Sequence, residues 1–197
     1  MTLTKTELRN QQHRLGQLQK YLPTLQLKKM LLQVEVQAAE QEIKEFAREF
    51  QLKKGRVVAY ASLFSSSGSF DLFPAVKVVQ IDRIAENIAG VDLPILDRVI
   101  FQESKHLLFD APVWLDSAIS GLRELIILKE KITISKERKA ALEKELREVS
   151  IRVNLFEKIL IPRAQEAIRK IKIFLGDQQL AAVCQAKVAK FKIESLG

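Results

Sequence analysis

Few residues of this sequence combine a reactive type with a spacing that could support catalysis. The two histidines, His13 and His106, are far apart in the chain, and neither has a second metal ligand at a suitable spacing. The single cysteine, Cys184, has no neighbouring histidine and no CxxC partner that would make it a nucleophile. We therefore interpret both histidines as surface residues and Cys184 as a small residue on a helix face.

The sequence also lacks the motifs that bind nucleotides. It contains neither a GxxxxGK[ST] phosphate-binding loop nor a GxGxxG turn. Acidic residues such as Glu143 and Glu145 cannot share a site, because positions i and i+2 point apart on a helix. We therefore expect a protein that is not an enzyme, with no catalytic, cofactor-binding or metal-binding residues, and a mechanical or scaffolding function.

The composition is that of helices with one apolar face. The 197 residues include only 7 Gly and 5 Pro, with 28% charged and 47% hydrophobic residues. The first residues, MTLTKTELRNQQ, lack the apolar core of a signal peptide, and no stretch of 18 uncharged apolar residues could span a membrane. The single cysteine excludes an internal disulfide framework. We expect a soluble intracellular protein without direct membrane insertion.

The positive charge lies at both ends of the chain. Of the formal net charge of +8, residues 1–55 contribute +4, residues 56–113 contribute −2 and residues 114–197 contribute +6. Such an excess could bind nucleic acid or anionic lipid. However, the 24 acidic residues are interleaved with the basic ones, which is typical of solvated helix faces. We therefore expect no nucleic-acid partner.

The N-terminal segment, residues 1–64, has the apolar repeat of a coiled-coil helix. Counting alternately three and four residues onward from Leu8 gives thirteen positions on one face of the helix, which we call the seam. Eleven of the thirteen residues are apolar. These positions are Leu8, Gln11, Leu15, Leu18, Leu22, Leu25, Lys29, Leu32, Val36, Ala39, Ile43, Phe46 and Phe50. Pro23 interrupts the segment, but the repeat continues beyond it, so we predict a kink near residues 19–21 and not a helix end.

The C-terminal segment, residues 112–197, repeats this pattern. Nine of its eleven seam positions are apolar: Leu125, Leu128, Ile132, Ser135, Lys139, Leu142, Leu146, Val149, Val153, Phe156 and Leu160. Beyond Leu160 the apolar face shifts to Ala164, Ile168, Ile171 and Leu175, and Pro162 lies at this change of register. Intramolecular antiparallel pairing of the two segments is favoured by the tether between them, and parallel dimerisation of each with another copy is the alternative.

The central region, residues 65–111, is predicted to contain a β-hairpin. Residues 76–84 and 95–101 are rich in β-branched side chains, and residues 87–94 supply Gly, Asp and Pro for a connection. An amphipathic helix over residues 76–88 is the alternative. We expect Trp114 to cap the core where the last helix begins. Phe46 and Phe50 are bulky for a two-helix seam, and Ile126, Ile127 and Ile134 lie off it. These five residues either contact the hairpin or form a docking face for another subunit. The fold class is thus mainly α, a long antiparallel two-helix coiled coil with a small central hairpin.

One string of residues resembles a known family. Residues 152–163 contain the pattern Arg152, Val153, Asn154, Glu157, Ile161, Pro162 and Arg163, and a proline inside a heptad helix is unusual. In the central region, Gly90, Val91 and Pro94 resemble the hairpin turn of the same family. These residues are similar to the signature of the D subunit of the V-type (vacuolar/archaeal-type) ATPases and ATP synthases.

The resemblance implies a central rotor shaft that transmits rotation between an ion-translocating membrane sector and a catalytic ring. It implies coupling of ATP synthesis or hydrolysis to proton or sodium transport. The implied partners are the A and B subunits of the ring, the small F subunit of the central stalk and a socket subunit of the membrane sector, and no cofactor is implied. The implied location is cytoplasmic and peripheral to the membrane. The alternative is a stand-alone coiled-coil scaffold or tether.

Overall fold

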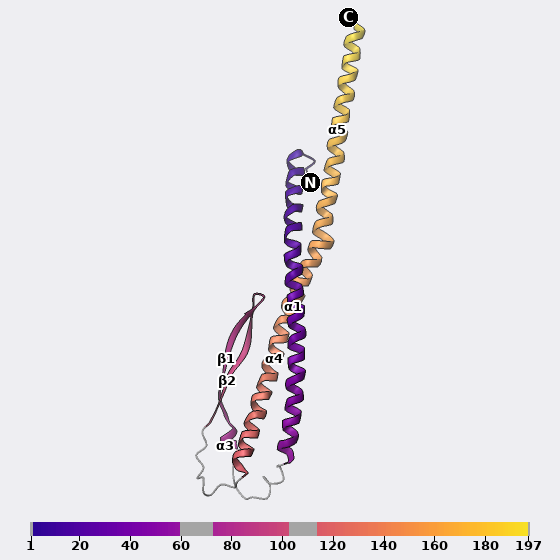
Figure 1. Cartoon of the computed structure of the whole chain (residues 1–197). Helices are drawn as coiled ribbons and strands as arrows, with labels where there is room; N and C mark the ends of the chain where they lie inside the picture. Colours follow the sequence, from indigo (N-terminus) through magenta and orange to yellow (C-terminus); the bar gives the residue numbers. More distant parts are fainter. Residues whose placement is uncertain (1, 60–72, 103–113, 197) are drawn as a thin grey trace. The chain divides into compact units, whose positions relative to one another are not determined.

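The computed structural model describes residues 2–59, 73–102 and 114–196 (Figure 1). The order of elements is α1 (Lys5–Ala59), α3 (Phe73–Val76), β1 (Val78–Ile88), β2 (Val91–Phe101), α4 (Leu115–Leu155), the π-helical turn η1 (Phe156–Leu160) and α5 (Ile161–Leu196). The mainly helical fold with one antiparallel hairpin is confirmed. The segment boundaries predicted at 64/65 and 111/112 lie outside the described residues.

The chain forms two compact units. Residues 30–147 form one, which contains the hairpin and which we call the hairpin unit. Residues 1–29 and 148–197 form the other, which contains both chain ends and which we call the terminal unit.

Helix α1 begins at a capping threonine and passes through a proline. The backbone N–H of Glu7 donates to Thr4 Oγ1 at 3.2 Å, which satisfies one of the unpaired donors of the first turn. Pro23 lies inside the helix, which continues through it, so the prediction that the proline does not end the helix is confirmed. The apolar repeat continues on both sides of Pro23, and its burial offsets the lost backbone hydrogen bond.

The predicted seam is the buried side of each helix. All thirteen predicted positions of α1 are buried or half-buried, and so are all eleven of α4 and η1. Leu32 and Leu142, both in the hairpin unit, are 0% exposed. An apolar side chain that repeats every 3.5 residues stays on one face of the helix, and burial of that face stabilises the pairing.

Ion pairs show that α1 and α4 run antiparallel within the hairpin unit. Glu40 of α1 pairs with Lys139 of α4 at 3.6 Å. Lys53, thirteen residues later on α1, pairs with Glu124, which lies fifteen residues earlier than Lys139 on α4, at 3.1 Å. Between them, Lys131 Nζ lies 5.5 Å from the ring centroid of Phe46. The intramolecular antiparallel pairing is therefore observed in this unit.

The hairpin is longer, and its connection shorter, than predicted. Only Ala89 and Gly90 connect the strands, with φ of 53° and 80°, as a type I′ turn requires. The Gly90 N–H donates to Asn87 Oδ1 at 3.1 Å, and Asn87 Nδ2 donates to Asp92 Oδ1 at 2.7 Å. Residues 87–94, predicted as the connection, thus lie largely in the strands.

Two residues predicted for the turn lie in β2. Val91 pairs with Ile88, and Pro94 pairs with Ala85. Cross-strand pairs of an antiparallel ladder alternate between hydrogen-bonded and non-hydrogen-bonded pairs. Counted from the hydrogen-bonded pair next to the turn, Ile88 and Val91, the pair of Ala85 and Pro94 is not hydrogen-bonded. The missing N–H of proline therefore costs no ladder bond there. Proline favours turns, but such a position in a two-stranded sheet accommodates it equally well.

The base of the hairpin packs against the start of α4. Ala75, Leu115 and Ile119 form a buried cluster, and Val76 and Trp114 pack against it. The prediction that Trp114 caps the core at the beginning of the last helix is therefore confirmed.

The left-handed conformation of Ala89 predicts a stabilising substitution. An alanine at positive φ carries a steric cost of about 1 kcal/mol that glycine avoids. We expect Ala89→Gly to increase protection of the hairpin amides from hydrogen exchange several-fold, with exchange followed by mass spectrometry or NMR. The matched substitution Gly90→Ala puts a second alanine at positive φ and should decrease protection. Lower protection in Ala89→Gly would contradict this account of the turn.

Candidate interaction surfaces

Among the described residues, those that could do chemistry do not form a metal site. His13 is exposed, with Nε2 at 3.1 Å from Nε2 of Gln17, and Cys184 is an exposed free cysteine. His106 lies outside the described residues. Across residues 2–59, 73–102 and 114–196, no three His, Cys, Asp or Glu side chains come together as a metal site, and no helix is long and apolar enough to cross a membrane. The candidate sites are therefore surfaces.

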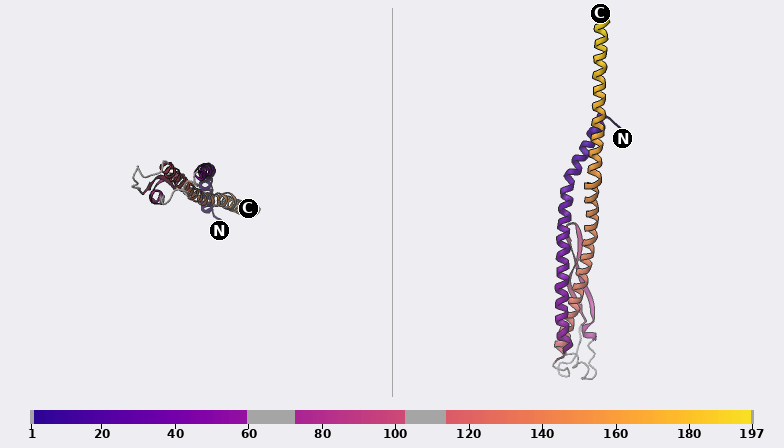
Figure 2. Two further views of the ribbon diagram at one scale, coloured as in Figure 1. Left: turned by 90° about the horizontal axis from the view of Figure 1, so that it is seen from below. Right: turned by 90° about the vertical axis from the view of Figure 1, so that its right-hand side faces the viewer.

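The end of α5 is exposed along its described length. Within the terminal unit, α5 continues past the start of α1 in both side views (Figures 1 and 2). Every described side chain of residues 176–195 is exposed. Five of them are large and apolar, with 53–72% exposure: Leu180, Val183, Val188, Phe191 and Ile193. A run of exposed apolar side chains of this kind marks an interaction surface.

The same unit carries the basic residues predicted at both chain ends. The side chains of Arg9, Arg14, Lys20, Arg163 and Arg169 are exposed, whereas Lys28 and Lys29 are half-buried. Residues 1–30 contain one acidic residue, Glu7, whose Oε1 accepts a hydrogen bond from Gln11 at 2.8 Å. The terminal unit thus combines positive charge with the apolar end of α5, a composition suited to an acidic or apolar partner surface.

The seven residues of the signature surround a π-helical turn. Arg152, Val153 and Asn154 lie in the last turn of α4, which ends at Leu155. Glu157 lies in η1, and Ile161 begins α5, followed by Pro162 and Arg163. In η1 the N–H of Ile161 donates to the carbonyl of Phe156, five residues back.

The π-helical turn explains how the helix continues past its proline. Pro162 has no N–H to donate to the carbonyl of Lys158, and the wider turn before it absorbs the change of register. The apolar face accordingly continues on Ala164, Ile168, Ile171 and Leu175, all buried or half-buried.

The signature side chains divide into an apolar and a polar group. Val153 is buried, at 4% exposure, and Ile161 and Pro162 are half-buried. The other four, Arg152, Asn154, Glu157 and Arg163, are exposed, and Arg152 pairs with Glu148 at 3.8 Å. The apolar members therefore serve the helix itself, and the exposed polar members are accessible to another molecule.

Ionic contacts fix the register of α1 against α4 in the hairpin unit, and none of them was predicted from the sequence. Arg138 lies 3.9 Å from both Glu35 and Glu42. A hydrogen bond from Lys44, together with the charge of Lys139, holds the pKa of the Glu40 carboxyl below its usual value. Opposite charges flanking an apolar seam specify which helix faces pair.

Lys53 joins the same two helices near the end of α1. Hydrogen bonds to Glu49 and then Glu124 raise the pKa of Lys53. The ammonium thus has one partner on its own helix and one on α4. The spacing of charges along a single helix could have suggested the Glu49 pair, at i and i+4, but not the Glu124 pair.

Phe46 and Ile134, two of the five residues that the seam left unexplained, line a cavity together with residues of the hairpin. The cavity has a volume of about 230 Å³ and lies between Pro94–Leu96 of β2 and the two helices. Phe46 and Ile134 thus face the hairpin across this cavity, which favours the first alternative for these two side chains. For Phe50, Ile126 and Ile127 the two alternatives stay predictions.

Comparison with known families decides the identity of the chain. The family model for the D subunit of ATP synthase matches residues 7–191. The chain belongs to the ATP synthase D-subunit family. The V-type ATP synthase D subunit of Chlamydia pneumoniae is 44% identical over 193 residues, which cover 98% of this chain and 92% of that protein. The V-type ATP synthase D subunit of Chlamydia trachomatis serovar L2 is 43% identical, covering 98% of this chain and 95% of its own length.

Membership of the D-subunit family agrees with the resemblance based on residues 152–163. The family match spans both helices and the hairpin, so it covers nearly the whole chain and not the signature alone. The roles of the individual signature residues remain predictions.

Proposed function

We propose that this chain is the central-stalk shaft of a V-type ATP synthase or ATPase. It transmits rotation between the ion-translocating membrane sector and the catalytic ring of A and B subunits, and so couples ATP synthesis or hydrolysis to proton or sodium transport. The observation that carries the proposal is the end of α5, where all described side chains are exposed and five are large and apolar, which provides a surface for insertion into a ring. The free-standing scaffold is the less favoured alternative, because the relatives over the full chain are ATP synthase subunits.

The two paired helices suit a part that carries torque. A shaft must resist twisting, and the buried seam with ionic contacts on both sides holds α1 and α4 together in the hairpin unit. We infer that the chain itself is not catalytic and that nucleotides bind the ring.

We assign partners by surface. The end of α5 and the basic residues of the terminal unit would meet the A and B subunits, while the hairpin unit would meet the small F subunit and the socket of the membrane sector. In this arrangement the chain is peripheral to the membrane on the cytoplasmic side.

The basic residues predict a salt-dependent contact with the ring. A variant in which each of four basic residues is replaced by glutamine loses four positive charges from the terminal unit. The four residues are Lys28, Lys29, Arg163 and Arg169. We expect ring affinity to fall roughly tenfold at low salt, and the dependence of affinity on salt to become flatter, because surface charges are screened. Titration of labelled chain with the ring at two salt concentrations measures both effects. Binding that is unchanged at either concentration would contradict electrostatic steering at this surface.

Co-purification tests the proposed function directly. The A and B subunits from the native operon are purified with and without this chain, and ATPase activity is measured. We expect one copy of the chain per three A/B pairs and turnover that depends on it. A stable A/B ring that neither binds the chain nor responds to it would instead favour the coiled-coil scaffold.

A further inference from the structure

The hairpin unit contains an arginine that touches both ends of the hairpin. Arg123 of α4 donates from Nε to the carbonyl of Ala75 at 2.8 Å, just before β1. It also donates from Nη2 to the carbonyl of Gln102 at 3.2 Å, just after β2. Its Cζ lies 5.2 Å from the ring centroid of Phe101, the last residue of β2.

The two ends that Arg123 joins are already closed on each other. The N–H of Gln102 donates to the carbonyl of Lys77 at 2.9 Å, which continues the ladder below the strands. Arg123 therefore does not close the hairpin. It connects the closed base to the helix.

The middle of the hairpin is held less completely. Leu93 is buried, but the cavity of about 230 Å³ separates Pro94–Leu96 from part of the helix surface. Farther along, Arg83 Nη1 lies 3.0 Å from Glu137 Oε2, and both side chains are more than 40% exposed. An exposed single ion pair is screened by solvent and fixes orientation weakly.

The three contacts of Arg123 require a planar guanidinium with N–H donors that point in different directions. A guanidinium can donate to two carbonyls in different directions while its face lies on an aromatic ring. A lysine ammonium is a point charge at one position and cannot make all three contacts together.

We propose that Arg123 is the positioning residue that fixes the base of the hairpin on α4, so that hairpin and helix move as one rigid body. Without it, the hairpin stays folded but changes its angle to the helix. The proposal concerns the chain by itself and is independent of whether the chain works in a rotary complex.

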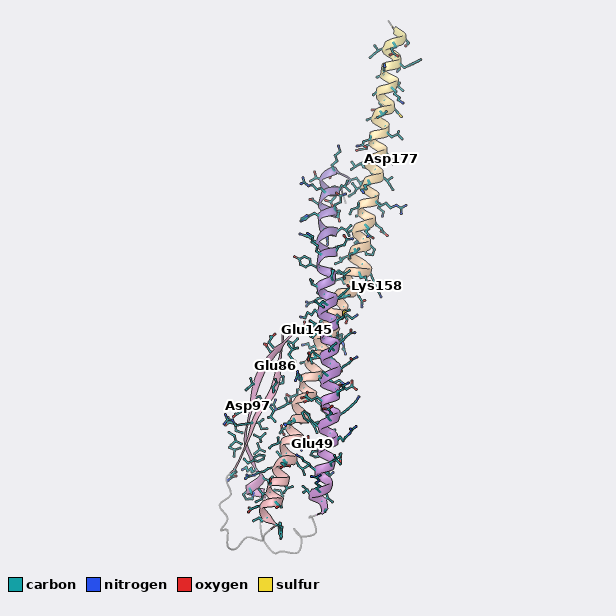
Figure 3. All side chains as sticks on the ribbon, viewed as in Figure 1. Glu49, Glu86, Asp97, Glu145, Lys158 and Asp177 are labelled. Carbon is teal, nitrogen blue, oxygen red and sulfur yellow. The ribbon has the colours of Figure 1, made fainter. Side chains whose placement is uncertain are left out.

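Spin-label distances test the proposal. In the full chain with Cys184→Ser, labels are attached at Glu86→Cys, near the turn, and at Lys144→Cys on α4, next to Glu145, which Figure 3 labels together with Glu86. Pulsed electron paramagnetic resonance then gives the distribution of distances. We expect a single narrow distribution for the reference chain and one at least about twofold broader for Arg123→Lys.

Arg83→Lys is the matched control. It makes the same substitution at another arginine that joins the hairpin to α4, where an ammonium can replace a single ion pair. We expect its distribution to equal the reference. A narrow distribution in Arg123→Lys, or equal broadening in both variants, would overturn the proposal.

Hydrogen exchange distinguishes a swinging hairpin from an unfolded one. The amides that pair β1 with β2 should remain protected in Arg123→Lys. Loss of that protection would also overturn the proposal, because Arg123 would then hold the hairpin together and would not merely orient it.

Discussion

Removal of residues 178–197 is expected to leave the paired helices folded and to abolish tight association with the A/B ring. All described side chains after Leu175 are exposed, so their loss removes no seam contact from the terminal unit. Five large apolar side chains are lost as a binding surface. At about 1.5 kcal/mol for each that becomes buried on binding, ring affinity should fall by more than about 100-fold. Ring titration measures this loss, and circular dichroism should show the same melting temperature as the full chain.

A pair of point variants separates apolar contact from helix length. Phe191→Asp places a charge on the apolar surface, whereas Gln185→Asp places the same charge on an exposed polar position of the same helix segment. We expect the first to weaken ring binding at least about tenfold and the second to have little effect. A truncated chain that binds the ring as tightly as the full chain would rule out the end of α5 as the inserted surface.

The second large effect is expected at the centre of the seam. Leu142 is 0% exposed within the hairpin unit, so Leu142→Ala loses the transfer energy of the side chain and leaves a cavity. Such substitutions cost about 2–5 kcal/mol of unfolding free energy. For a chain of this size that corresponds to a fall in melting temperature of about 4–20 °C.

Leu52→Ala is the matched control for this loss. Leu52 lies on α1 in the same unit, is 66% exposed, and undergoes the same change of side chain. We expect it to change the unfolding free energy by about 0.5 kcal/mol or less. Thermal and urea unfolding followed by circular dichroism compare the two variants. Equal destabilisation would mean that the buried seam does not hold the helices together.

The seam was predictable from the sequence because helical periodicity is a local property. The repeat through Leu32 and Leu142 can be counted along one chain segment, and both side chains are at the centre of their seams. Pro23 and Pro162 were correctly placed within helices, since the apolar repeat continued past each. The accommodating π-helical turn was indicated only by the shift of the repeat at Leu160.

The surfaces were predicted less completely. The basic ends were evident from the composition, but the exposed apolar end of α5 was not predicted. Its signal is the run from residue 178 to 191, which contains Leu180, Val183, Val188 and Phe191 with only Lys187 and Lys190 charged. The existence of the hairpin was predicted from its β-branched residues, but its ends were not, because Asn and Pro are typical of turns and proline is also tolerated in an edge strand.

The sequence by itself determined the two helices, their buried faces, a hairpin between them and membership of a family. It could do so because each follows from residues close together in the chain or from a pattern shared with relatives. Only the tertiary structure decided that Lys53 faces Glu124, that Glu40 faces Lys139, and that Arg123 joins both ends of the hairpin to α4. These contacts join residues far apart in sequence, so they depend on the register of one packed element against another, which no local pattern specifies.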